Sequence, residues 1–400
     1  MYSKQITKDV YSVGVLNPNM RVFDIIMKTD FGTSYNSYIV KGSEKAALID
    51  ASHLTFTQSF VENIKSVIEL EKIDYLIMNH NEPDHSGAIA KLLEIAPHIK
   101  IVTSQAGAIY LKNIINKDIA ITVVKDGDTL ELGNKQLKFI NAPFLHWPDS
   151  MFTYSQSDKV LFSCDFFGSH YCEPEVIDTK ITYKENYFTA LKGYYDAIFG
   201  PFGKYVQNGL KKIQGLDISY VATSHGPILS KDGVLDEVVK KYSEWSSEKL
   251  HDEKIIPLFF CSAYGNTRLI AKSIAQGIKN VFPTAIVETY DIIKHDMAQM
   301  SALLNDSDAF LLGSPTLNKD AVAPVWQLLS GVDAINIAKR PAAIFGSYGW
   351  SGEAFQSLTK RLESLKVNLV QEPFKVCFVP TSDDLKNAQL FGETFAKALK

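Results

Sequence analysis

The sequence predicts an α/β protein with two domains, and three observations support this prediction. The chain has 400 residues, more than the roughly 100–200 that one domain usually contains. Short apolar runs with helices between them fill its first part, whereas strands and helices alternate strictly in the rest. A polar stretch at residues 242–254 separates the two patterns and leads into a new apolar run at 255–260. We therefore expect domains at residues 1–250 and 251–400.

The composition excludes several classes of protein. Hydrophobic residues make up 46% of the chain, which is ordinary for a globular protein. The 41 Lys and Arg residues against 45 Asp and Glu leave a net charge of −4, which does not favour nucleic-acid binding. No apolar run approaches the about 18 residues that span a bilayer, and the first residues lack the features of a signal peptide. We expect a cytoplasmic protein with no membrane or nucleic-acid partner.

Four cysteines are present, and none forms a C-x-x-C pair. This number and spacing predict neither a disulfide framework nor a cysteine-bound zinc or iron–sulfur site.

Short runs rich in β-branched and aromatic residues predict the strands of the first domain. These strands are expected at residues 38–41, 46–49, 75–78, 101–103, 121–124, 137–140, 160–163 and 219–223. Turn signals such as Asp126-Gly127-Asp128 and Leu132-Gly133-Asn134 are typical of hairpins. A mixed or mainly antiparallel sheet covered by helices is therefore expected.

Strict alternation predicts the elements of the second domain. Strands are expected near residues 255–261, 285–290, 308–313, 342–346 and 374–379. Helices are expected near residues 267–281, 296–304, 321–331, 352–365 and 383–399. Ile270, Ile274 and Ile278 mark one apolar face of the first of these helices. Five strand–helix repeats predict a doubly wound parallel sheet of five strands.

Four potential metal ligands lie within the run His80-Asn81-Glu82-Pro83-Asp84-His85, directly after the predicted strand 75–78. Taken singly, each residue has a structural explanation, and Asp84 or Ser86 could cap the next helix. Packing two carboxylates and two imidazoles together, however, costs desolvation and like-charge repulsion unless a cation neutralises them. The run therefore predicts a metal site.

Three further residues, His146, Asp165 and His225, each follow the end of a predicted strand. Side chains at the same ends of neighbouring strands converge, so these three can share one site with the run at 80–85. Seven donors are too many for one tetrahedral metal. They suit two metals that share one carboxylate and keep open positions for a substrate.

This pattern resembles the metal site of the metallo-β-lactamase fold, in which His-x-[His/Glu]-x-Asp-His precedes a distant His, Asp and His. In the hydrolases of that superfamily the third position is usually His and the metal is zinc. Glu82 adds a hard oxygen ligand, which favours iron or manganese. The Glu variant is typical of the flavodiiron proteins. That resemblance implies an αββα sandwich and three sets of ligands: His80, Glu82 and His146 for one iron, Asp84, His85 and His225 for the other, and Asp165 as the bridge.

Residues 258–271 predict a strand, a tight polar loop and the start of a helix. The hydroxyls of Ser262 and Thr267, with the N–H groups at the helix N-terminus, can hold a phosphate monoester. Thr267 alone could be a helix cap. No P-loop lysine follows, which disfavours nucleoside triphosphate hydrolysis. Polar loops at 313–318 and 346–352 follow two later strands, at the sheet edge where such folds bind ligands.

The loop that contains Ser262 and Thr267 is similar to the FMN phosphate loop of flavodoxins. The glycines of the third loop are spaced G-x-x-G-x-x-G, which does not match the dinucleotide fingerprint. In flavodoxin-like domains this loop lies along the isoalloxazine ring, with an aromatic residue such as Tyr348 or Trp350 beside it. The resemblance places FMN against Ser262, Ala263, Tyr264, Gly265, Asn266 and Thr267; Ser314, Pro315, Thr316, Leu317 and Asn318; and Ser347, Tyr348, Gly349, Trp350, Ser351 and Gly352.

The resemblance to flavodiiron proteins covers residues 35–400, with both domains in the expected order. It implies an oxidoreductase that reduces dioxygen to water, nitric oxide to nitrous oxide, or both, at a non-haem diiron centre supplied by FMN. The seven metal ligands are then the catalytic residues. FMN and two irons together store four electrons, the number needed to reduce dioxygen to two waters. A dinuclear zinc hydrolase with an appended flavodoxin domain, and a non-catalytic electron carrier, are the alternatives.

The resemblance also has implications for partners. The chain ends at Lys400 without C-x-x-C pairs, so fused rubredoxin and flavin-reductase modules are not expected. Electrons would come from a separate donor, a rubredoxin or a reduced deazaflavin carrier. A head-to-tail homodimer, or a dimer of such dimers, would set each flavin against the metals of the other protomer. Tyr194, Tyr195 and His170 could hydrogen-bond metal ligands. The preferred gas does not follow from these residues.

Overall fold

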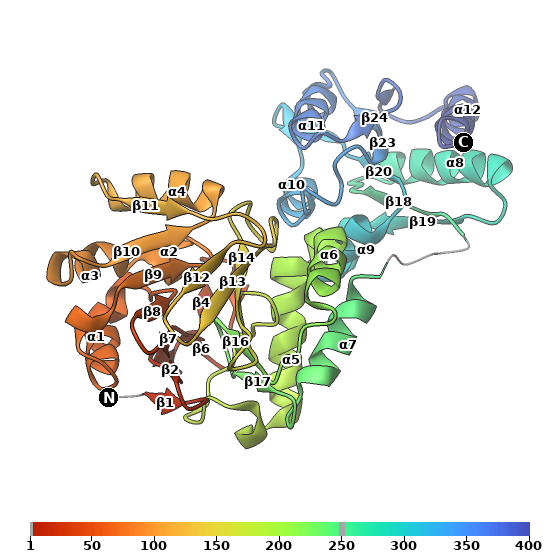
Figure 1. Ribbon diagram of the computed structural model, residues 1–400. Helices are drawn as coiled ribbons and strands as arrows, with labels where there is room; N and C mark the ends of the chain where they lie inside the picture. The colour runs from red at the N-terminus through yellow and green to blue at the C-terminus, as the bar shows by residue number, and fades with distance from the viewer. Residues whose placement is uncertain (1–2, 248–252) are drawn as a thin grey trace. The chain divides into compact units, whose positions relative to one another are not determined.

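The computed structural model describes residues 3–247 and 253–400. The chain forms two compact units, Met1–Glu248 and Lys249–Lys400 (Figure 1). The predicted boundary between residues 250 and 251 lies outside the described residues. Among the described residues, no helix has the length and apolar character needed to cross a bilayer.

The first unit contains a mixed sheet of seven strands. In sheet order they are β1 (Lys4–Gln5), β2 (Val10–Ser12), β7 (Tyr38–Lys41), β8 (Ala46–Ile49), β9 (Tyr75–Met78), β10 (Lys100–Thr103) and β11 (Ile121–Val123). The pairs from β1 to β8 are antiparallel, and those from β8 to β11 are parallel. The carboxyl end of β9 therefore lies beside those of β8 and β10.

A second sheet of six strands completes the β layers of this unit. Its order is β12 (Thr129–Glu131), β13 (Gln136–Asn141), β14 (Met151–Ser155), β15 (Val160–Cys164), β16 (Tyr220–Thr223) and β17 (Leu229–Ser230). Only β15 and β16 pair in parallel. It follows that β13, β15 and β16 all run in the same direction and end at one edge.

Helices cover the outer face of each sheet, and the two sheets pack on each other between them (Figure 1). The first sheet is covered by α1 (Thr57–Lys65), α3 (Ile89–Ile95) and α4 (Gln105–Ile115), and the second by α5 (Lys184–Tyr194), α6 (Gly203–Ile213) and α7 (Leu235–Trp245). Strand alternation produces these layers: Leu76 and Met78 pack among the helices, whereas Ile77 packs between the sheets. The expected αββα sandwich is confirmed.

The structure corrects two details of this unit. The turn at 126–128 does not close a hairpin, because it joins β11 of one sheet to β12 of the other, whereas the turn at 132–134 does join β12 to β13. Two small hairpins that the sequence did not predict also form. They pair β3 (Val15–Asn17) with β6 (Thr33–Tyr35) and β4 (Val22–Phe23) with β5 (Met27–Lys28).

The second unit contains a parallel sheet in the order β19-β18-β20-β23, followed by a divided edge strand. Its strands are β18 (Ile255–Phe260), β19 (Ile286–Asp291), β20 (Phe310–Gly313), β23 (Pro341–Tyr348), β24 (Asn368–Leu369) and β25 (Phe374–Cys377). The short β24 pairs with the start of β23, and β25 pairs with its end. Together β24 and β25 fill the place of the fifth strand, so the doubly wound five-stranded sheet is confirmed.

Helices lie on both faces of this sheet (Figure 1). One face carries α8 (Asn266–Val281) and α12 (Ser382–Lys397), and the other carries α9 (Met297–Asp306), α10 (Ala323–Ser330) and α11 (Glu353–Ser364). The helices α8 and α12 approach so closely that a Cβ at Gly277 would lie 1.9 Å from the carbonyl oxygen of Gln389. A small hairpin, β21 (Thr316–Leu317) with β22 (Asp320–Ala321), follows β20.

Short helical turns connect several elements. They are the 3-10 turns Leu54–Phe56, Leu70–Lys72, Asp178–Lys180, Gly200–Phe202 and Ile292–Lys294, the short helix α2 (Pro83–Ser86) and one π-helical turn at Tyr195–Phe199.

Candidate functional site

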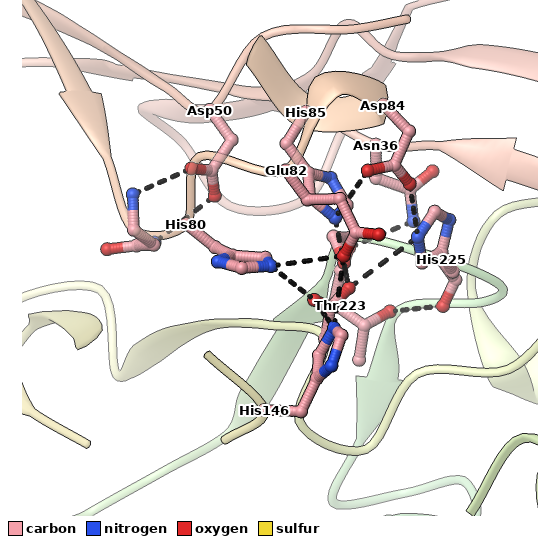
Figure 2. A network of polar contacts seen from close by, with 12 residues as sticks. Asn36, Asp50, His80, Glu82, Asp84, His85, His146, Thr223 and His225 are labelled. Atoms are coloured by element: carbon pink, nitrogen blue, oxygen red, sulfur yellow. Dashed lines mark hydrogen bonds and ion pairs between the residues drawn. The ribbon is translucent and has the colours of Figure 1, made fainter. Parts of the chain in front are cut away.

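The run at 80–85 lies at the carboxyl end of β9. His80 is two residues past the strand, and Glu82 occupies the N-cap position of α2. Pro83 opens the helix, where the N–H that proline lacks would have no helical partner. Asp84 and Ser86 were candidates for the cap of the next helix, but both lie inside α2, so neither caps a helix. One turn of helix thereby directs Asp84 and His85 to the same side as His80 and Glu82 (Figure 2).

The other three predicted ligands come from the second sheet. His146 follows β13, Asp165 follows β15 and His225 follows β16. Because these strands end at one edge, the three side chains meet there. Left-handed backbone at Cys164, with φ of 51°, turns the chain immediately before Asp165.

His80, Glu82 and His146 form one group of donors. The Nε2 atoms of His80 and His146 lie 3.3 and 3.0 Å from Oε2 of Glu82. The same nitrogens lie 3.5 and 3.7 Å from Oδ2 of Asp165. Four donor atoms from these residues are therefore close enough to surround one ion.

Asp84, His85 and His225 form the second group. His85 Nε2 lies 3.3 Å from Oδ1 of Asp84, and His225 Nε2 lies 3.0 Å from its Oδ2. The two nitrogens lie 3.1 and 3.5 Å from Oδ1 of Asp165. Asp165 thus faces one group with each of its oxygens.

The donor set fits a pair of metal ions. Asp84, His85 and Asp165 are buried, yet both oxygens of Asp84, Nε2 of His85 and Oδ2 of Asp165 have no hydrogen-bond partner among the described residues. Buried polar atoms are normally hydrogen-bonded, since leaving one unpaired costs about 1–3 kcal/mol. A cation between these lone pairs would satisfy them. Four imidazoles and three carboxylates suit iron or manganese.

The electrostatics of the protein chain alone also favour a cation. Burial works against protonation of His85, but Asp84 and Asp165 raise its pKa to about 9. Burial would raise the pKa of Asp165, but His85 and His80 hold it well below its ordinary value. Without metal, protons on the imidazoles take the place of the positive charge that this cluster of carboxylates requires.

Asp149 supports the first group, and the sequence did not single it out. The Nδ1–H of His80 donates to Oδ1 of Asp149 over 3.1 Å. The backbone N–H and the side-chain amide of Asn81 each donate to Oδ2 of Asp149 over 2.8 Å. A carboxylate behind a ligating histidine fixes its tautomer and strengthens it as a donor. The sequence offered one indication of this role, which is that Asp149 lies close to His146 in the same loop.

Two hydroxyls support Asp165. Ser224 Oγ donates to its Oδ1 over 2.7 Å, and Tyr194 OH donates to the same oxygen over 3.1 Å. In the second group, the Nδ1–H of His225 donates to the carbonyl oxygen of Ser34 over 2.6 Å.

The other residues suggested from the sequence differ in their contacts. His170 Nδ1 lies 2.9 Å from Thr33 Oγ1, and its ring lies 5.1 Å from that of His225. Tyr195 packs with its ring 5.0 Å from those of Tyr242 and Trp245, within the core. The described contacts of Tyr195 include no predicted ligand, so a role in holding one is not supported.

The β4–β5 hairpin also reaches the site, and the sequence missed it. Phe23 lies 4.5 Å from the ring of His170, measured between centroids. Burial and the neighbouring carboxylate of Glu82, with which Asp24 shares a hydrogen bond, raise the pKa of Asp24 to about 6. The two strands of this hairpin have two residues each, which is too short for a periodicity that a sequence pattern could reveal.

The segments predicted to hold FMN lie at the carboxyl ends of three adjacent strands of the second unit, β18, β20 and β23. The third predicted loop begins later than expected, because β23 runs to Tyr348 and includes Gly346 and Ser347. Residues 261–265 join β18 to α8, and Gly265, with φ of +90°, precedes the helix. Thr267 lies inside the first turn of α8, so it does not cap the helix. Its Oγ1 lies 3.0 Å from Ser347 Oγ, which joins the first loop to the third. The first N–H groups of α8 have no helical partner and can bind an anion.

The end of β23 also touches the second loop. Gly346 is required there, because a Cβ would lie 2.0 Å from the carbonyl oxygen of Ser314. Thr316 Oγ1 in the second loop is buried without a hydrogen-bond partner among the described residues, so it is available to a ligand. The loop ends in the tight β21–β22 hairpin, where Asn318 and Lys319 have φ of 50° and 60°.

Large aromatic side chains are exposed at this edge of the sheet. Tyr264 and Trp350 are 92% and 93% exposed, and Tyr348 packs against the core. Phe378, at the end of β25, is 61% exposed and lies against Gly349, a feature that the sequence did not predict. A phosphate cradle beside exposed rings fits a flavin mononucleotide, which joins a phosphate to a planar ring system.

Comparison with known proteins identifies both units. Residues 33–226 match the model of the ODP family beta lactamases, and residues 258–392 match the model of flavodoxins. The chain is 53% identical to the flavo-diiron protein FprA2 of Clostridium acetobutylicum over 397 residues, which cover 99% of both chains. It is 36% identical to the anaerobic nitric oxide reductase flavorubredoxin of Vibrio vulnificus, over 83% of this chain and 67% of that protein.

A solved structure shows the same architecture over the whole length. The rubredoxin oxygen:oxidoreductase of the anaerobe Desulfovibrio gigas superposes with a TM-score of 0.72 and 29% identity, covering 99% of this chain and 98% of that one. The flavodoxin match covers the second unit, and the relative at 53% identity is named a flavo-diiron protein. The chain therefore belongs to the flavodiiron protein family, oxidoreductases whose cofactors are FMN and a non-haem diiron centre.

Proposed function

We propose that this protein reduces dioxygen to water, nitric oxide to nitrous oxide, or both, with electrons that FMN passes to a diiron centre. The observation that carries the proposal is the position of Asp165, whose two oxygens face two separate groups of donors. A bridging carboxylate is what a pair of ions requires when both must act on one small substrate.

Each residue of the centre has a proposed task. His80, Glu82 and His146 would hold one iron, Asp84, His85 and His225 would hold the other, and Asp165 would bridge them. When bound, the two irons would supply one-electron steps between the ferrous and ferric states. The chain itself fixes the donors: Asp149 orients His80, and Ser224 and Tyr194 orient Asp165. Phe23 and His170 place bulk beside His225, which limits the access of water.

The two parts of the chain would divide the work. Residues 1–250 would form the diiron domain and residues 251–400 the FMN-binding domain. Ser262, Thr267 and the N-terminus of α8 would hold the phosphate, and Thr316 and Ser347 would hydrogen-bond the ligand from the other loops. Tyr264, Tyr348 and Trp350 would flank the ring.

The names of the similar proteins refer to both gases, so the preference for dioxygen or nitric oxide has to be found by experiment. One relative is named an anaerobic nitric oxide reductase and one structural neighbour an oxygen oxidoreductase. We further propose that a separate donor, a rubredoxin or a reduced deazaflavin carrier, supplies the electrons. A head-to-tail dimer, alone or paired with a second, would bring each flavin to the metals of the other protomer.

One experiment tests the core of the proposal. The purified protein, reconstituted with FMN and ferrous iron without oxygen, is photoreduced and then mixed with dioxygen or nitric oxide in a stopped-flow instrument. Reoxidation of the flavin by at least one gas is expected in the wild type and in His98→Ala, a surface control. His85→Ala should lose this reoxidation. Preference for zinc when both metals are supplied, with no reoxidation of the iron-loaded protein, would instead indicate a hydrolase.

A further inference from the structure

We propose that the two halves of the metal centre give their irons unequal reduction potentials, so that the iron held by Asp84, His85 and His225 is reduced first. This inference rests on the proposed function and concerns how the centre stores its electrons. It requires a difference between the two groups of ligands, and the kinds of donor that they contain provide none.

The two groups contain the same donors. Each has two imidazoles, one carboxylate of its own and one oxygen of Asp165. Donor type therefore predicts equal potentials. Any inequality must come from the groups that hydrogen-bond the ligands, because such outer partners change how much electron density a ligand gives its metal.

Asp165 is the first source of inequality. Its Oδ1, which faces His85 and His225, accepts hydrogen bonds from Ser224 over 2.7 Å and from Tyr194 over 3.1 Å. Its Oδ2, which faces His80 and His146, has no hydrogen-bond partner among the described residues. Hydrogen bonds withdraw electron density from the oxygen that accepts them. The second group thus receives the weaker oxygen donor, which favours ferrous over ferric iron there.

The histidines are the second source, and they act in the same direction. His80 donates to the buried carboxylate of Asp149, an ionised acceptor that makes the imidazole a stronger donor. In the other group, His225 donates to a neutral carbonyl oxygen, that of Ser34, and His85 Nδ1 has no partner among the described residues. The first group therefore stabilises ferric iron more strongly than the second.

Two further carboxylates face the centre without hydrogen-bonding to a histidine ligand. Asp24 shares a hydrogen bond with Glu82, and two carboxylates do so only when one of them holds the proton, so Asp24 adds no second full charge to the first group. The charge of Asp50 favours ferric iron in the second group, because it interacts more strongly with His85 than with His80. Its oxygens accept their hydrogen bonds from Asn79, however, and contact no ligand directly. Direct hydrogen bonds to the ligands should outweigh this more distant charge.

The test is an anaerobic potentiometric titration of the iron-loaded holoprotein, followed by the EPR signal of the half-reduced iron pair. Ser224→Ala and Tyr194→Phe each remove a donor from Oδ1 of Asp165, so the higher of the two iron potentials should fall. Asp149→Asn removes the charge behind His80, so the lower potential should rise. All three variants should therefore decrease the difference between the two iron potentials and reduce the maximum yield of the half-reduced iron pair. Tyr195→Phe, a neighbouring buried tyrosine that touches no ligand, should change neither potential.

The opposite assignment makes the opposite prediction. If the iron of the first group were reduced first, Ser224→Ala would decrease the lower of the two iron potentials. Asp149→Asn would increase the higher of the two. Both variants would then widen the separation, which overturns the inference, as would unchanged potentials in all three. If Asp149→Asn fails to load iron, Ser224→Ala and Tyr194→Phe decide the question. A wild type that binds no iron, or that neither gas reoxidises, refutes the proposed function instead.

Discussion

The Nε2 atom of His85 lies 3.1 Å from Oδ1 of Asp165, and both side chains are buried. In the chain without metal, a proton on the imidazole stabilises this contact, and the acidic neighbours of His85 raise its pKa to about 9. A metal ion competes with that proton, because a ligating nitrogen must offer its lone pair.

Iron affinity should therefore fall as the pH falls. A pKa raised to about 9 means that His85 is protonated at neutral pH in the metal-free protein, so binding releases at least one proton. Affinity should then rise about tenfold per pH unit for each proton released, up to about pH 9. Competition with a chromogenic chelator at pH 6, 7 and 8, without oxygen, measures this slope. An affinity that does not change with pH would contradict the assignment of His85 as a ligand.

Glu82→His should change the metal that the protein selects. Glu82 places a carboxylate oxygen 3.0 Å from Nε2 of His146, where the hydrolases of the same fold usually have an imidazole. Replacing a hard oxygen with nitrogen favours zinc over iron. Elemental analysis after reconstitution with equal iron and zinc should show a lower iron-to-zinc ratio than in the wild type. Glu94→Gln, on the surface, should leave the ratio unchanged.

Asp165→Asn should empty both halves of the centre, because its oxygens serve both groups of donors. An amide keeps the shape but loses the charge that holds two cations. Gas reduction should fall by more than the roughly 10- to 100-fold that loss of an outer partner costs. Iron per chain and flavin content are measured together. Asp217→Asn, an exposed control, should keep both. Retention of two irons in Asp165→Asn would refute the bridging role.

The contiguous run at 80–85 could be predicted from the sequence because its density of charge has no structural explanation. His146, Asp165 and His225 could be predicted from their places after apolar strands, since strand direction then brings them together. The division of the ligands into two groups came from resemblance to a family, because spacing along the chain does not encode which oxygen faces which nitrogen.

Residues that support the site were harder to predict. Asp149 and Ser224 resemble ordinary loop residues until the fold places them against His80 and Asp165. Asp24 depends on a hairpin whose strands have only two residues each. The split of the fifth strand into β24 and β25 was likewise invisible, since a two-residue strand shows no alternation. Tertiary contacts, not local pattern, determine all of these features.

Gly346→Ala should weaken FMN binding and leave the metal content unchanged. A Cβ there would lie 2.0 Å from the carbonyl oxygen of Ser314, so the end of β23 and the second loop would have to separate. Such overpacking costs about 1–3 kcal/mol, which, where it is taken from the free energy of binding, corresponds to a loss of about 5- to 150-fold in affinity. Flavin fluorescence on titration of the apoprotein measures it. Unchanged affinity would show that these loops do not form the binding site.

Gly277→Ala should destabilise the second unit without touching either cofactor site. The new Cβ would lie 1.9 Å from the carbonyl oxygen of Gln389, and the backbone of α12 would have to move away from α8. The expected cost is about 1–3 kcal/mol, despite the better helix propensity of alanine. Gly193→Ala is the matched control, because a Cβ in that helix meets no atom within 4 Å. Its stability should stay equal or rise by up to about 1 kcal/mol. Calorimetry of both variants measures the difference, and equal melting temperatures would show that α8 and α12 pack less closely than described.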